Sequence, residues 1–175
     1  MVCVALLVFG KISSRDIYNV LCRLNVECRV VLPGETPDFN FTHIIISGGP
    51  HSVYQESFTI LPSWIVDSTC PVLGICYGAQ LIAAHFGSVI KRMDELKKGC
   101  FDIIEFRGDK QVTISRYINC IDEISYLSDN FTVTGVTNDN KIASFTDEKR
   151  FWGVQYRPES TRSKDSKIFK RFLKI

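Results

Sequence analysis

Short apolar runs alternate with amphipathic segments through the first half of the chain. Such runs are typical of buried strands, and apolar residues three and four positions apart are typical of helices. The runs predict strands at Met1–Phe9, Val26–Leu32, His43–Ser47 and Pro71–Ile75. The helical spacing predicts a helix capped by Ser13 or Ser14 with Ile17, Val20, Leu21 and Leu24 on its apolar face, a second near Pro62–Ser68, and a third over Tyr77–Phe86 that stops at Gly87.

Strands dominate the second half of the chain. Alternation with period two predicts strands at Phe101–Phe106, Gln111–Ser115, Phe131–Thr137, Lys141–Phe145 and Phe151–Tyr156. Polar turns are predicted at Arg107-Gly108-Asp109 and Asn138-Asp139-Asn140, and helical spacing returns at about Lys164–Ile175. No linker or repeat interrupts the pattern. Residues 1–175 are therefore expected to form one α/β domain of three layers, with a mixed, mostly parallel sheet flanked by helices.

The segment Gly74-Ile75-Cys76-Tyr77-Gly78 joins a predicted strand to a predicted helix. Gly-x-Cys-x-Gly is the thiol form of a nucleophile elbow, in which the glycines allow a sharp turn. Cys76 would then lie at a helix N-terminus, where the helix dipole and free N–H groups favour a thiolate. The alternative is a buried structural cysteine at a strand end.

A second candidate turn, Ser47-Gly48-Gly49-Pro50, directly follows a predicted strand. Backbone N–H groups in such a turn can stabilise an oxyanion. A Gly-Gly-Pro turn can equally be an ordinary loop, because both residue types favour turns.

Three segments of the chain resemble the class I, or triad-type, glutamine amidotransferases: Ser47–Tyr54, Pro71–Ala83 and Gly153–Glu159. Within that family they are similar to the glutaminase domain of GMP synthetase, because Ser-Val-Tyr follows the Gly-Gly-Pro turn. The resemblance covers nearly the whole chain in the expected order. It implies a flavodoxin-like core and a place in purine biosynthesis.

The resemblance also implies residue roles. Cys76 would attack the side-chain amide of glutamine, giving a thioester and ammonia. The backbone N–H groups of Gly49 and Tyr77 would form the oxyanion hole, and Glu159 would orient the base. The residues implied to hold glutamine or the oxyanion are Gly48, Gly49, Tyr77 and Gln80. No metal and no cofactor is implied.

The departures from the family pattern are as informative as the matches. Arg157 stands where the family has the triad histidine. Arginine stays protonated and has no acceptor, so it could lower the pKa of a thiol but not relay the proton. Arg157 is expected to pair mainly with Glu159, because a carboxylate is the stronger partner of a guanidinium. Two other family segments, Asp-Phe-Gly-x-Gln and Ser-His-Gly-Asp, appear here as Val8–Ile12 and Asn119–Asp122.

None of the three histidines is an evident replacement for the missing base. His51 follows the Gly-Gly-Pro turn and is expected near the rim of the pocket. His85 lies two turns along the helix behind Cys76, and His43 opens a buried strand. The alternative to a catalytic role is a satisfied surface or core histidine.

Composition narrows the class of protein further. The chain is 45% hydrophobic, and its net charge of +2 is too small to require nucleic acid. Seven cysteines without Cys-x-x-Cys spacing predict reduced thiols, a cytoplasmic location and no zinc site. Met1–Phe9 has no basic region before its apolar run, so a strand is favoured over a signal peptide. No apolar run reaches the roughly 20 residues that span a bilayer.

The last segment is basic and has two interpretations. Its lysines can form a solvated helix face while Ile168, Phe169, Phe172 and Ile175 face the core, or they can dock an acidic partner. The resemblance implies an ATP-pyrophosphatase or synthetase subunit, or another protein, as partner, and glutamine as a ligand. The expected function is a pseudoenzyme with lost or strongly impaired glutaminase activity, retained for binding. The alternative is an active glutaminase subunit that supplies ammonia to a separate synthetase.

Overall fold

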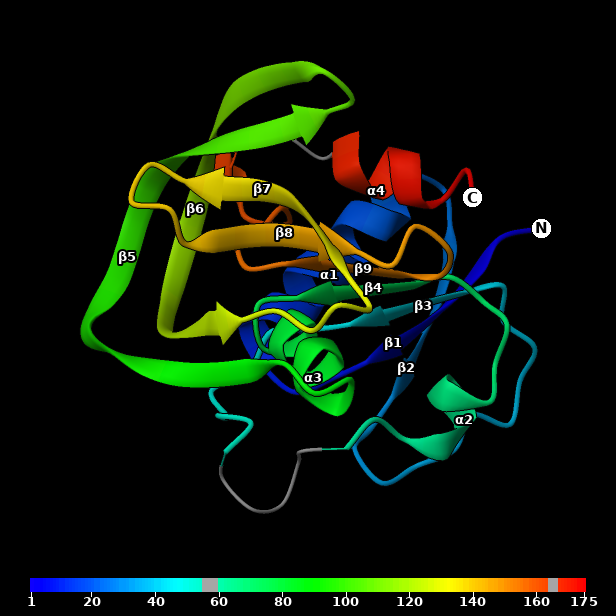
Figure 1. The fold of residues 1–175 in the computed structure, drawn as a ribbon. Helices are drawn as coiled ribbons and strands as arrows, with labels where there is room; N and C mark the ends of the chain where they lie inside the picture. The colour runs from blue at the N-terminus through cyan, green and yellow to red at the C-terminus, as the bar shows by residue number, and fades with distance from the viewer. Residues whose placement is uncertain (55–59, 164–166) are drawn as a thin grey trace.

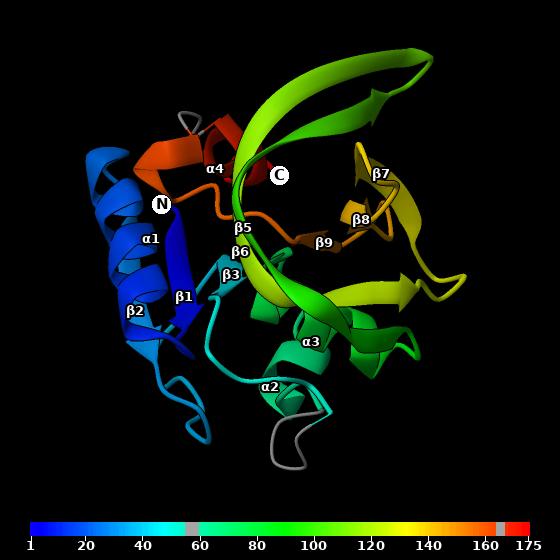
Figure 2. The same ribbon diagram turned by 90° about the vertical axis from the view of Figure 1, so that its left-hand side faces the viewer.

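The computed structural model describes residues 1–54, 60–163 and 167–175. In this part of the chain, nine strands form one sheet in the order β2-β1-β3-β4-β9-β8-β7-β5-β6. Figures 1 and 2 show helices against both faces of the sheet. The expected α/β class, with a mixed sheet flanked by helices, is confirmed.

The parallel half of the sheet contains five strands: β2 (Glu27–Val31), β1 (Cys3–Leu7), β3 (His43–Ile46), β4 (Val72–Ile75) and β9 (Phe151–Val154). Every residue of β1, β3 and β4 is buried, as is usual for parallel strands that are covered on both faces. This strand order is that of a flavodoxin-like core. Loops that follow its parallel strands meet at the carboxyl edge, where such sheets bind ligands.

The antiparallel half continues from β9 through β8 (Ile142–Thr146) and β7 (Thr132–Thr137) to β5 (Val89–Arg107) and β6 (Lys110–Tyr126). In Figure 2, β5 and β6 form a long curved hairpin that extends beyond the rest of the sheet. Gly108, with φ of 58°, lies in the turn between them, so the predicted hairpin turn is confirmed.

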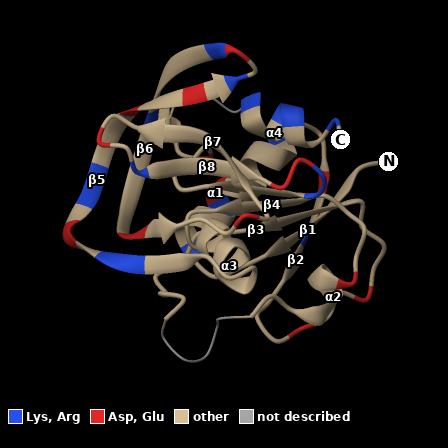
Figure 3. Cartoon of the chain, viewed as in Figure 1, with Lys and Arg blue, Asp and Glu red and all other residues tan. Residues whose placement is uncertain are grey.

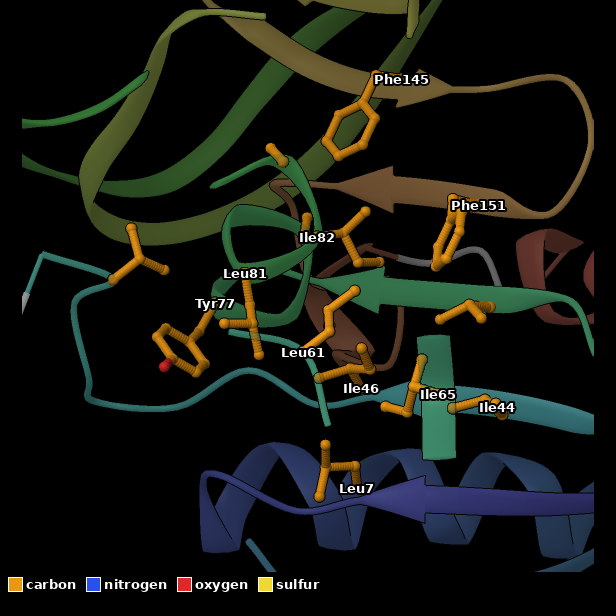
Figure 4. Packing of buried hydrophobic residues seen from close by; sticks show 14 of the residues in the cluster. Leu7, Ile44, Ile46, Leu61, Ile65, Tyr77, Leu81, Ile82, Phe145 and Phe151 are labelled. Atoms are coloured by element: carbon orange, nitrogen blue, oxygen red, sulfur yellow. The ribbon is translucent and has the colours of Figure 1, made fainter. Parts of the chain in front are cut away.

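Two apolar cores lie on opposite faces of the sheet. α1 (Lys11–Arg23) and α4 (Lys167–Phe172) contribute to the core on one face. α2 (Ser63–Val66) and α3 (Tyr77–His85) contribute to the core on the other, and a short 3₁₀ helix, Thr161–Ser163, precedes α4. Figure 4 shows this second core, which contains Tyr77, Leu81 and Ile82 of α3, Ile44 and Ile46 of β3, and Ile65 of α2. The packed sheet thereby gives a rigid base to the loops at its carboxyl edge.

Two predictions about local structure are wrong in instructive ways. β5 and β6 are much longer than the predicted Phe101–Phe106 and Gln111–Ser115. The missed stretch of β5, Lys91–Lys98, is charged and mostly exposed, so it carries no apolar alternation. The cap of α1 is Gly10 rather than Ser13 or Ser14, and both serine side chains are used in tertiary hydrogen bonds instead.

The basic last segment packs part of its apolar side into the core, and docking of an acidic partner stays a prediction. Phe169 and Phe172 are buried, and Figure 3 shows basic positions on α4. Ile175 was expected to face the core but is 62% exposed, because α4 ends at Phe172. Lys164, at the start of the predicted helix, lies outside the described residues. Among the described residues, the longest helix is too short and too polar to cross a membrane.

Candidate active site

Cys76 lies in a strained turn between β4 and α3. Its φ and ψ are 53° and −108°, an uncommon conformation for a residue with a side chain. Its N–H donates to the carbonyl of Val154 at 2.7 Å, which ties the turn to β9. The flanking glycines are required by space, because a Cβ on Gly74 would lie 2.6 Å from the backbone of Gly78. A Cβ on Gly78 would lie 2.3 Å from the carbonyl oxygen of Ile46. The strand-to-helix turn predicted from Gly-x-Cys-x-Gly is therefore present.

A cavity of about 870 Å³ opens beside this turn. The fold brings all the residues predicted for the site to its wall: Gly48, Gly49, Cys76, Tyr77, Gln80, Arg157 and Glu159. Tyr77 and Gln80 lie on α3, and the others lie in the segments that follow β3, β4 and β9. These segments meet because the three strands are parallel neighbours. Residues from β6, including Cys120 and Asp122, close another side of the cavity. The roles of these residues remain predictions.

Glu159 is buried and is held by a residue of the first helix. Ser13 Oγ donates to Glu159 Oε1 at 2.7 Å, and Glu159 Oε2 has no hydrogen-bond partner among the described residues. Burial raises the pKa of Glu159 to about 6, although Ser13 and the charge of Arg157 lower it. At neutral pH the carboxylate is therefore ionised in a site that only partly compensates its charge.

Arg157 does not form the ion pair predicted for it. No Arg157–Glu159 contact falls within salt-bridge distance among the described residues, and the Nε atom of Arg157 is buried without a partner. Its backbone instead fixes its position, because its N–H donates to Tyr117 and its carbonyl accepts from Ser163 Oγ at 2.6 Å. From there its charge lowers the pKa of both Cys76 and Glu159. The guanidinium therefore acts on both groups through space and is bonded to neither.

Cys120 is the residue of the site that the sequence analysis missed. Interaction with Cys120, followed by burial, raises the pKa of Cys76 well above its usual range. The same interaction lowers the pKa of Cys120 to about 7. Gln80 Nε2 also donates to Cys120 Sγ at 3.2 Å, and Cys120 Sγ lies 3.1 Å from the carbonyl oxygen of Asp122. One signal was available, since Cys120 stands in the segment that corresponds to the Ser-His-Gly-Asp of the family.

The side chains of Asp122 and Gln80 both form hydrogen bonds within the chain. The buried carboxylate of Asp122 accepts hydrogen bonds from Ser52 Oγ and Tyr54 Oη, each at 2.7 Å. Gln80 Nε2 donates to the carbonyl of Asp122 at 3.3 Å as well as to Cys120. These hydrogen bonds connect β6 to α3 and to the loop after β3. A ligand that bound the same polar atoms would have to replace these hydrogen bonds.

Each of the three histidines has contacts of its own in the structure. His51 lines the cavity as predicted, and its ring packs against Phe9 and Tyr77. His85 accepts a hydrogen bond from the N–H of Leu61, and burial lowers the pKa of His43. The groups that act on the Cys76 thiol are Cys120, Arg157 and Glu159, and no described histidine is among them. Among the described residues, no three histidine, cysteine or acidic side chains are arranged to hold a metal ion.

Comparison with known proteins agrees with the geometry. The family model "Glutamine amidotransferase class-I" matches residues 7–175. GMP synthase [glutamine-hydrolyzing] of Histophilus somni is 30% identical over 97% of this chain and 36% of its own length. The Thermotoga maritima enzyme of the same description is 33% identical over 86% of this chain and 31% of its own length. The chain thus spans about a third of the length of these relatives.

Solved structures show the same fold at lower sequence identity. A Thermoplasma acidophilum protein assigned as a GMP synthase subunit has a TM-score of 0.84 at 24% identity, covering 99% of this chain and 93% of its own. The structure of PurLQS from Thermotoga maritima has a TM-score of 0.77 at 18% identity, covering 99% of this chain and 98% of the other.

Proposed function

This chain belongs to the class I glutamine amidotransferase family, and from that premise we propose that it is a GMP synthetase-type member whose glutaminase activity is lost or strongly impaired. Its cavity and fold are then retained for binding a ligand or a partner protein. The single observation that carries the proposal is that the described groups acting on the Cys76 thiol are a second thiol, a guanidinium and a carboxylate, with no imidazole among them.

Glutamine hydrolysis through a thioester needs a base that takes the thiol proton and then delivers a proton to departing ammonia. Arg157 occupies the position of that base in sequence, and a guanidinium has no acceptor for the proton. Interaction with Cys120 and burial also raise the pKa of Cys76, so little thiolate exists at neutral pH. Loss of one member of such a triad typically costs about 10⁴–10⁶ in turnover.

Binding does not need the base. The cavity has the volume of an ordinary small-molecule site, and the Gly48–Gly49 turn and Tyr77 still line it. Glutamine is the ligand that family membership suggests. A synthetase is the corresponding partner, since these relatives are named GMP synthase.

An ammonia-release assay tests the proposal. The isolated chain, alone and with candidate synthetase subunits, should release ammonia from glutamine at the background rate of Cys76→Ala. Arg157→His should raise the rate if the rest of the pocket supports the reaction. A robust wild-type rate that Cys76→Ala abolishes would reject the pseudoenzyme. Glutamine binding is measured separately by titration calorimetry, with asparagine as the matched control ligand.

One observation favours the alternative, an active glutaminase subunit. Cys120 and Cys76 line the same cavity, and the lowered pKa of Cys120, about 7, suits it to accept and return a proton. In that case the wild-type chain hydrolyses glutamine, and Cys120→Ser removes the activity while Arg157→Ala has a smaller effect. The assay above, extended to these two variants, distinguishes the two functions.

A further inference from the structure

The cavity of about 870 Å³ is lined by three acidic side chains of the described residues, and each of them has a partner. The carboxylate of Asp122 accepts hydrogen bonds from two hydroxyl groups, and that of Glu159 accepts one from Ser13. Asp16 Oδ1 lies 3.5 Å from Arg15 Nε in an ion pair at the surface. Each acidic group of this wall is therefore already bonded within the chain.

Four basic side chains line the same cavity in the described part of the chain, and three of them have no such partner. Arg162 is the exception, because its guanidinium lies 4.8 Å from the centroid of the Tyr117 ring. Lys11, Lys98 and Arg157 form no side-chain hydrogen bond and no ion pair with any other described residue. These three cations are therefore available to a negatively charged ligand.

The three unpaired cations lie at two depths. Arg157 is half-buried, and its Nε atom is buried without a partner among the described residues. A buried donor of this kind is normally hydrogen-bonded, and an unmet one costs free energy unless a ligand supplies the acceptor. Lys11 and Lys98 are exposed and come from the first turn of α1 and from β5. The cavity thus offers one cation inside and two nearer to solvent.

The Gly48–Gly49 turn leaves the inner end of the cavity free of a bulky side chain. A Cβ on Gly48 would lie 3.4 Å from the Cβ atom of Cys76 and 3.2 Å from Ser13 Oγ, so the turn lies directly against the elbow. The volume of about 870 Å³ holds ligands larger than an amino acid. Charge, rather than size, therefore has to select the ligand.

We propose that this cavity binds a short dicarboxylate of the size of glutamate, and that it binds glutamate more tightly than glutamine. One carboxylate pairs with the guanidinium of Arg157, whose planar fork matches a carboxylate with two parallel hydrogen bonds. The second carboxylate lies near Lys11 and Lys98, whose charges act on it in partial contact with water. This ligand class rests on the proposed function, since it concerns the same cavity in a chain that binds rather than hydrolyses.

Glutamate and glutamine have nearly the same shape, so the wall distinguishes them mainly by charge. A hydrogen bond between a guanidinium and a carboxylate is roughly twice as strong as one between neutral groups. Glu159 opposes a dicarboxylate, because its own carboxylate lies in the same wall. It is buried and bonded to Ser13, so it acts at a distance rather than by contact. Removing the charge of Glu159 should therefore strengthen the binding of glutamate.

Titration calorimetry tests the proposal in Cys76→Ala, which consumes no glutamine during the measurement. Glutamate should bind at least about 10-fold more tightly than glutamine, the difference expected from one charge-assisted hydrogen bond. Adding Arg157→Gln should weaken glutamate by at least about 10-fold and remove the preference. Arg162→Gln is the matched control and should keep the preference, because the guanidinium of Arg162 lies on Tyr117. Glu159→Gln should strengthen glutamate binding.

Glutarate and its monoamide repeat the comparison without an ammonium group and should show the same order of affinity. The proposal is overturned if glutamine binds as tightly as glutamate, if neither ligand binds, or if folded Arg157→Gln keeps the preference. Circular dichroism verifies that Arg157→Gln is folded, and if it is not, the glutarate pair and Glu159→Gln decide. Failure of the proposed function is a separate result. Ammonia release by the wild type would reject the pseudoenzyme and leave the order of affinities in Cys76→Ala unchanged.

Discussion

Ser13 and Glu159 are joined by a 2.7 Å hydrogen bond between buried side chains, although 146 positions separate them in the sequence. The bond fixes the first turn of α1 to the loop that follows β9. Ser13 is 3% exposed, so no water can replace its hydroxyl as a donor without rearrangement. Glu159, the residue that family resemblance assigns to orienting a base, is therefore held from the opposite end of the chain.

Removing the Ser13 hydroxyl should lower the free energy of unfolding. Ser13→Ala leaves Glu159 with one fewer hydrogen bond in a buried site, and an unsatisfied buried group of this kind costs about 1–3 kcal/mol. The free energy of unfolding, measured with urea at pH 7, should fall by that amount. Ser14→Ala is the matched control, since Ser14 lies in the same helical turn but bonds Gly10 and Ser47. An equal loss in both variants, or none in Ser13→Ala, would contradict this account.

Glu159 should also make stability depend on pH. Its pKa in the folded chain, about 6, is above the value of 4.5 for a free glutamate, because burial penalises the charged form. Folding therefore favours the protonated carboxyl. The contribution of Glu159 to the free energy of unfolding is fully present below about pH 4.5 and is lost as the pH rises through about 6. A shift of this size corresponds to about 2 kcal/mol.

Glu159→Gln removes this titration while keeping an oxygen that can accept from Ser13. The variant should lose the fall in stability between about pH 4.5 and 6 and should be more stable than the wild type at pH 7 by up to about 2 kcal/mol. Urea unfolding of both proteins at a series of pH values measures the difference. Parallel curves for the two proteins across this interval would assign the effect to another group.

The elbow should tolerate no side chain at Gly78. A Cβ there would lie 2.3 Å from the backbone oxygen of Ile46 on β3, and neither the helix nor the strand can move away freely. Gly78→Ala should lower the free energy of unfolding by about 3 kcal/mol or more. Gly34→Ala is the control, because a Cβ there meets nothing and only its φ of +89° opposes the change, at about 1–2 kcal/mol. Similar losses in the two variants would show that crowding at the elbow is not decisive.

The sequence was sufficient for features that depend on local chemistry. The elbow around Cys76, the turn at Gly48–Gly49 and the parallel strands follow from glycine spacing and continuous apolar runs. Ser13 was assigned to a helix cap because its real partner, Glu159, is invisible to local rules. The charged part of β5 was missed because strand pairing, rather than burial, makes it a strand.

The two residues that most change the chemistry of the site are not predictable from local patterns. Arg157 was expected to pair with the nearby Glu159. Its backbone is held by hydrogen bonds to Tyr117 and Ser163 instead, and its guanidinium forms no ion pair with Glu159 and no bond to Cys76. The position of Cys120 depends on how β6 runs past the turn at Cys76, and the long pairing of β5 with β6 sets that course. Tertiary geometry therefore decides which groups act on the Cys76 thiol.

The effect of Cys76 on the pKa of Cys120 gives the last prediction. Interaction with the Cys76 thiol is the largest cause that lowers the pKa of Cys120 to about 7. In Cys76→Ala this thiol is absent, and the pKa of Cys120 should rise, since burial then opposes the thiolate and only Gln80 and the backbone near Asp122 support it. Cys70→Ala is the control and should leave the pKa of Cys120 at about 7. The measurement is the rate of iodoacetamide labelling at Cys120 against pH, resolved by peptide mass spectrometry. A midpoint that stays near 7 in Cys76→Ala would mean that Gln80 and the backbone near Asp122 alone stabilise the thiolate, and that the contact between the two cysteines does not decide which sulfur carries the charge.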